Sequence, residues 1–143
     1  MNLKSTPDSK KAFQMINPKE LYNPTAFAYS HVSEVHQFSR ILHISGQGGE
    51  NLQGQLSNDF AQQAHQALIN LQHALHAADA SLFDIAVLRI LVVDHSPQKH
   101  QNLIQEMQQY WKDHPFPACT LIPVPCLALQ GMQIEIEATA YCI

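Results

Sequence analysis

The apolar run Ile85–Val93 constrains the fold more than any other segment of this sequence. Its length and its boundaries, Asp84 and Asp94, predict a buried strand. Side chains alternate between the two sides of a strand, and here both sides are apolar except at Arg89. A strand of this kind is covered on both faces of its sheet. The chain must therefore cover both faces itself or obtain one cover from another molecule.

Two amphipathic helices are predicted on either side of this strand. Apolar residues recur every three or four positions over residues 60–78, with Ser57 or Asn58 as the capping residue. A second helix is predicted after the strand, because Ser96 is a good capping residue and Pro97 suits the first helical position.

Alternating patterns predict further strands at residues 27–35, 40–45, 118–124 and 133–142. The first two are joined by a short polar link, which favours a hairpin. The order of elements predicts an α+β fold with two helices packed on one face of a mixed sheet. The chain length indicates one domain, residues 16–143, after a flexible polar arm, residues 1–15.

Two helices cover only one face of this sheet, so the second face needs another cover. Burying each large apolar side chain of that face contributes about 1.5–3 kcal/mol. Symmetric self-association is the simplest source of the cover. The alternative is that the N-terminal arm and the loop at residues 46–56 fold back over the sheet.

Composition and charge exclude several classes of function. Apolar residues make up 45% and charged residues 14%, which predicts an ordered chain. Eight Lys and Arg against twelve Asp and Glu give a net charge of −4, which does not favour nucleic acid as a partner. No apolar run reaches the ~18 residues of a membrane helix. With no export signal at the N-terminus, we expect a cytoplasmic protein whose cysteines, Cys119, Cys126 and Cys142, are thiols.

Four groups of residues resemble, in their order and spacing, the Rid (YjgF/UK-type) family. They are Ala-Tyr-Ser at 28–30, Ile-Ser-Gly-Gln at 44–47, the strand with its flanking acids at 84–94, and Pro-Ala-Cys-Thr at 117–120 with Ile-Glu-Ile-Glu-Ala at 134–138. The resemblance implies a chorismate-mutase-like fold and a homotrimer, with a small-molecule cleft at each subunit interface. It also implies hydrolysis of reactive enamines and imines, such as 2-aminoacrylate, to 2-keto acids and ammonia, without a metal or organic cofactor.

The same resemblance implies the site residues. Tyr29, Gly46 and Thr120 would line the cleft, and Glu135 would orient or activate water. In the family motif Pro-Ala-Arg-Ser/Thr, the Arg binds the substrate carboxylate through two hydrogen bonds. Here Cys119 stands at that position. We predict that the lost contact lowers activity on small carboxylate substrates by at least about tenfold.

Several neighbouring residues carry more than one interpretation. Arg89 is predicted to pair with Glu135 or Glu137, the alternative being a relocated anion contact. Cys119 is either a small packing residue or a catalytic thiol, which would need a nearby base or cation. His43 is the histidine predicted to line the cleft. No metal site is predicted, because the helical histidines lack a Cys or carboxylate partner.

Two main hypotheses follow for function. The first is an imine or enamine deaminase whose activity is weakened, or redirected to a substrate without a carboxylate. The second is a trimer that binds a metabolite or a protein partner without catalysis. A ribonuclease or translation inhibitor is a third hypothesis, which the acidic charge balance disfavours.

Overall fold

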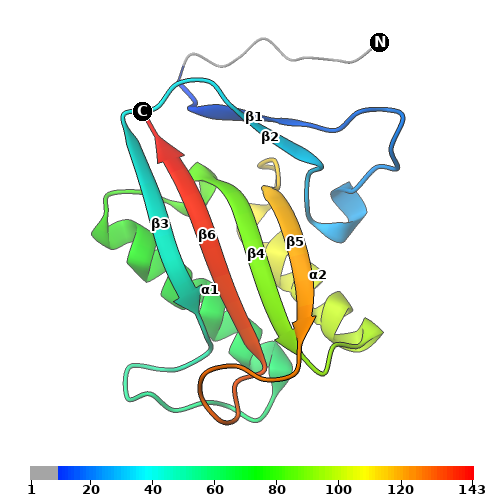
Figure 1. The fold of residues 1–143 in the computed structure, drawn as a ribbon, viewed down its shortest axis with the longest axis vertical. Helices are drawn as coiled ribbons and strands as arrows, with labels where there is room; N and C mark the ends of the chain where they lie inside the picture. The colour runs from blue at the N-terminus through cyan, green and yellow to red at the C-terminus, as the bar shows by residue number, and fades with distance from the viewer. Residues whose placement is uncertain (1–9) are drawn as a thin grey trace.

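The computed structural model describes residues 10–143, in which a four-stranded sheet packs against two helices. The sheet has the order β3-β6-β4-β5, formed by Arg40–Gln47 (β3), Ile134–Cys142 (β6), Ile85–Val93 (β4) and Ala118–Val124 (β5). Strand β4 runs antiparallel to β6 and parallel to β5, so the sheet is mixed. Both helices, α1 (Phe60–Ala77) and α2 (Pro97–Trp111), lie behind the sheet in Figure 1. The predicted α+β architecture is confirmed.

The core lies between the sheet and the helices. Every second residue of β6 is buried, from Ile134 to Cys142, and the residues between them are only partly buried. Helix α1 contributes Leu68, Leu71 and Leu75, all fully buried, to the same core. Among residues 10–143, neither helix has the length and apolar character needed to cross a bilayer.

The helix starts follow local capping. Ser96 accepts a hydrogen bond from the Lys99 amide at 3.2 Å, as predicted for the start of α2. At α1 the predicted caps are wrong, because the Asp59 carboxylate accepts from the Gln62 amide at 3.1 Å. Ser57 instead accepts from the Asp59 amide. The Ser57 hydroxyl therefore stabilises the turn that immediately precedes the helix.

The predicted strand at residues 27–35 and its hairpin with 40–45 are wrong in part. Residues Thr25–Phe27 form a 3-10 helix, and Ala28 has a left-handed backbone with φ of 59°, so strand β2 spans only Val32–Val35. Its partner is β1 (Phe13–Ile16), which it pairs antiparallel, whereas β3 pairs with β6. Figure 1 shows this pair crossing the end of the main sheet.

Strand β1 also shortens the predicted arm. Residues 1–9 lie outside the described residues. The last residues of the arm, Phe13–Met15, belong to β1. The arm was predicted from its polarity and low apolar content. These properties do not reveal a four-residue strand that depends on β2 for its hydrogen bonds.

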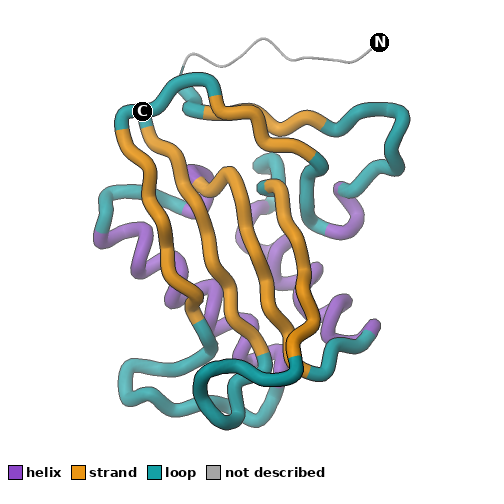
Figure 2. The backbone as a smooth tube through the Cα atoms, in the orientation of Figure 1, coloured by secondary structure: helices purple, strands orange, loops and turns teal. Residues whose placement is uncertain are grey.

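Within residues 10–143, the sheet face opposite the helices is open. Ile41 on β3 and Val87 on β4 are 43% and 40% exposed on it. The loop at residues 46–56 does not cover this face, because the Asn70 amide of α1 donates to the Gly48 and Glu50 carbonyl oxygens. Figure 2 shows this loop at the end of the sheet beside α1. The loop part of the alternative is therefore excluded, whereas residues 1–9 of the arm lie outside the described residues.

Candidate functional site

A cavity of about 300 Å³, here called the Cys119 cavity, lies between α2, β5 and the segment after the 3-10 helix. It brings together three of the predicted site residues, Tyr29, Cys119 and Thr120. Most of its remaining wall is apolar: Phe27, Ile90, Leu103, Ile104, Met107 and Leu121. Such a cavity suits the apolar part of a small molecule, with few polar groups to orient it.

Tyr29 reaches this cavity because the left-handed Ala28 turns the chain immediately before it. Its hydroxyl is hydrogen-bonded to that of Tyr22, and the two rings meet edge to face at 6.4 Å. Burial, and then the hydrogen bond with Tyr22, raise the pKa of Tyr29 to about 12. The phenol therefore stays protonated near neutral pH.

Cys119 lies on β5 beside Leu88 of β4 and packs against the core. Burial raises the pKa of its thiol to about 12. A catalytic thiol needs the opposite shift, which a nearby cation would produce. The geometry favours the interpretation of Cys119 as a small packing residue in the cavity wall.

Iodoacetamide is expected to modify Cys119 at least about tenfold more slowly than Cys126 at pH 8, because the thiolate is the reacting species. Cys126 is exposed and serves as the internal control. Peptide mass spectrometry over a pH series measures both rates. The Cys119 rate is expected to keep rising toward pH 12, following the raised pKa. A Cys119 rate above that of free cysteine at pH 8 would contradict this interpretation.

The other two predicted residues, Gly46 and Glu135, lie together elsewhere on the chain. Gly46 falls where the pairing of β3 with β6 is irregular, between Ile44 and Gln47. A Cβ atom added at Gly46 would overlap the Glu135 carboxyl group, so the carboxylate rests directly on the glycine. Neither residue lines the Cys119 cavity. One chain thus holds the predicted site in two separate halves.

Glu135 and the neighbouring ion pair lie on the side of the sheet away from the helices. The prediction that Arg89 pairs with a β6 carboxylate is confirmed: its guanidinium donates to Glu137 Oε1 at 2.7 Å. His43 lines a shallow hollow of about 230 Å³ with this pair. His43 does not line the Cys119 cavity, and the weak prediction that it lines the cleft has no support within one chain.

The sequence interpretation missed His100, which lines the Cys119 cavity from α2 and stacks on Phe27. Its position was available in the sequence, because residues 100, 103, 104 and 107 share one face of a helix. Across residues 10–143 no three His, Cys, Asp or Glu side chains are grouped to hold a metal ion.

Comparison with known proteins agrees with this geometry. A family model described as endoribonuclease L-PSP matches residues 22–142. A human protein named 2-iminobutanoate/2-iminopropanoate deaminase is 37% identical over 103 residues, which are 71% of this chain and 72% of the human one.

Two solved structures of Rid proteins have a similar fold. A protein of unknown function from the conserved Rid family of Yersinia pestis is 36% identical, with a TM-score of 0.86 over 91% of this chain and 98% of its own. RidA from an Antarctic Psychrobacter is 25% identical, with a TM-score of 0.66 over 77% of this chain and 87% of its own.

Proposed function

We propose that this chain, which belongs to the Rid (YjgF) family, hydrolyses reactive imines or enamines to a carbonyl compound and ammonia. An enamine first tautomerises to its imine. Water then adds to the carbon of the C=N bond, and the nitrogen leaves as ammonia after proton transfer. The observation that carries the proposal is the cavity that gathers Tyr29, Cys119 and Thr120. The relative named as an imine deaminase supports the reaction type.

The complete site is proposed to form between subunits of a homotrimer with the chorismate-mutase-like arrangement, in the cytoplasm. Two observations support the assembly. The open sheet face exposes Ile41 and Val87, and the two halves of the site are separate on one chain. Three copies packed through their sheets would place Glu135 of one copy beside the Cys119 cavity of the next.

The proposed roles follow from the chemistry of each group. Glu135 orients the attacking water and accepts its proton, since a carboxylate is a suitable general base near neutral pH. Tyr29 keeps its hydroxyl proton, because its pKa is raised to about 12, and limits the cavity at one end. Thr120, next to Cys119 on β5, contributes to the same cavity wall.

Substrate preference is proposed to follow from Cys119. The protonated thiol carries no charge to bind a substrate carboxylate, and the surrounding wall is apolar. The preferred imine would therefore be apolar and lack a carboxylate. Activity on 2-imino acids would persist at a reduced level.

Cys119→Arg is expected to raise kcat/KM for 2-iminobutanoate at least about tenfold, because a charge-assisted, two-point contact would bind and orient the carboxylate. Ammonia release is measured with the imine generated in the assay. The matched control is Cys119→Ser, which is similar in size but uncharged and should leave kcat/KM within about threefold of the wild type. Wild-type activity equal to that of Cys119→Arg would contradict the assigned role of position 119.

The cavity is present but lacks the Arg that binds the substrate carboxylate in the family motif. This combination also favours a second candidate function, binding without turnover. Imines with and without a carboxylate separate the two functions, because only a catalyst releases ammonia faster than spontaneous hydrolysis does. Stable keto-acid binding with no ammonia release above the spontaneous rate from any imine would favour the binding function. The family description also names an endoribonuclease, but the net charge of −4 does not favour RNA binding.

A further inference from the structure

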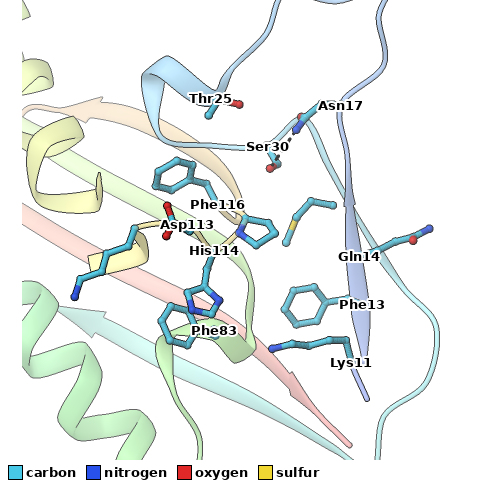
Figure 3. A pocket seen from close by; sticks show the side chains of 13 residues that line it. Lys11, Phe13, Gln14, Asn17, Thr25, Ser30, Phe83, Asp113, His114 and Phe116 are labelled. Atoms are coloured by element: carbon cyan, nitrogen blue, oxygen red, sulfur yellow. Dashed lines mark hydrogen bonds between the residues drawn. The ribbon is translucent and has the colours of Figure 1, made fainter. Parts of the chain in front are cut away.

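A second and larger cavity, of about 770 Å³, lies between β1, the segment Thr25–Ser30 and the turn after α2. We call it the N-terminal cavity, and Figure 3 shows the side chains that line it. Its volume falls in the range typical of small-molecule sites, roughly 300–1,000 Å³. None of the proposed site residues lines it. It is therefore separate from the site described above.

Aromatic rings form two opposite walls of the N-terminal cavity. Phe83 and His114 stack with ring centroids 3.7 Å apart and planes at 23°. Phe13 projects from β1 on the other side of the cavity, facing this pair (Figure 3). Phe116, which is 7% exposed, adds to the floor. A flat ring between these walls would contact apolar surface on both of its faces.

Two lysines are among the residues that line the cavity. Lys11, which precedes β1, extends toward the Phe83–His114 pair (Figure 3), and Lys112 also lines the cavity. Within residues 10–143, neither lysine forms an ion pair with a carboxylate. Asp113 is the one acidic residue of the lining, so the two lysines leave a net positive charge. This charge favours an anionic group on the ligand.

We propose that the N-terminal cavity binds a small organic acid with a flat aromatic body. The ring would lie between Phe13 and the Phe83–His114 pair, with the carboxylate toward Lys11. The proposal does not depend on the deaminase function. Thr25 and Ser30 line this cavity, whereas the residues between them, Phe27–Tyr29, line the Cys119 cavity. One short segment thus forms a wall of both cavities.

The test uses a matched pair of probes on the full chain, indole-3-acetate and the neutral indole-3-acetamide. Titrations followed by amide chemical shifts give both the affinity and the location. We expect shifts at Phe13, Thr25 and His114, and affinity for the acid up to about fivefold higher than for the amide, as suits exposed lysines. Lys11→Met should reduce that preference. Lys19→Met is the control, because Lys19 is exposed and does not line the cavity.

Three results would overturn the proposal. The first is the absence of shifts from either probe up to millimolar concentration. The second is a set of shifts confined to the helix α2 and β5 residues around Cys119. The third is equal affinity for the acid and the amide in both the wild type and Lys11→Met, which would remove the role of charge. Loss of the acid preference in Lys11→Met but not in Lys19→Met would support it.

Discussion

Glu135→Gln is expected to lower imine hydrolysis at least about 100-fold, because a positioned general base contributes roughly 10²–10⁴ to such rates. The amide keeps the shape of the side chain but cannot accept the proton of the attacking water. The loss should appear in kcat, because the proton transfer to Glu135 stabilises the transition state and not the bound substrate. The rate of hydrolysis is measured as ammonia release from an apolar imine.

Glu137→Gln is the matched control for this substitution. Glu137 lies two residues later on the same side of β6, and its carboxylate forms an ion pair with Arg89 that is exposed in the single chain. Because the pair lies beside Val87 on the sheet face proposed to join the subunits, the mass of both variants is checked first, and an assembled Glu137→Gln protein should keep its rate within about threefold of the wild type. Equal losses in the two variants would assign the effect to the sheet rather than to a base.

Gly46→Ala tests the same carboxylate from the neighbouring strand. The added methyl group would occupy the position of the Glu135 carboxyl group, which must move. A drop in rate similar to that of Glu135→Gln is expected, roughly 100-fold. An unchanged rate in a folded Gly46→Ala protein would show that the resting position of Glu135 does not matter for turnover.

The parts of the fold that the sequence predicted are those in which burial follows a regular period. Strand β4 matches its predicted bounds, Ile85–Val93, because acids flank a continuous apolar run. Strand β5 and the start of α2 also match, since Ser96-Pro97 combines a side-chain cap with a preset φ angle. In each case the information lies within about ten residues of sequence.

The N-terminal region failed because its structure depends on distant partners. The alternation from Phe27 to Val35 resembles a strand, yet Ala28 adopts a left-handed conformation. The Asn17 side chain accepts from the His31 amide at 2.8 Å, which fixes the turn from fourteen residues away. The local sequence pattern carries no information about a contact of this kind.

The candidate site was predicted as a set of residues but not as an arrangement. Tyr29, Cys119 and Thr120 share a cavity, as the cleft prediction requires, whereas Gly46 and Glu135 meet elsewhere. The sequence also gave no measure of the Cys119 environment. Burial sets its pKa, and that burial comes from packing against elements distant in the chain.

Val87→Asp is expected to convert the proposed trimer to a monomer. The wild type should have a solution mass of about three times the 16.1-kDa chain, measured by light scattering after size exclusion. Val87 is 40% exposed on the open sheet face. The substitution removes roughly 1.5–3 kcal/mol of apolar burial per copy and adds the cost of burying a carboxylate, several kcal/mol.

Gln105→Asp is the matched control, because Gln105 is exposed on α2, on the side away from the sheet. It adds the same charge to a surface that the proposed trimer leaves in water, so the mass should not change. A wild-type mass equal to one chain would contradict the assembly. A trimeric Val87→Asp would move the interface away from the sheet.

Mixing two inactive variants connects the assembly to the chemistry. Cys119→Trp fills the Cys119 cavity of its own chain but keeps Glu135, whereas Glu135→Gln keeps an open cavity. If each cleft combines the two halves from different subunits, co-refolded trimers regain activity, with about a quarter of their clefts carrying two intact halves. If both halves acted within one chain, every cleft would contain a defect and no activity would return. Recovery therefore distinguishes a shared site from a site within one subunit, independently of the trimer mass.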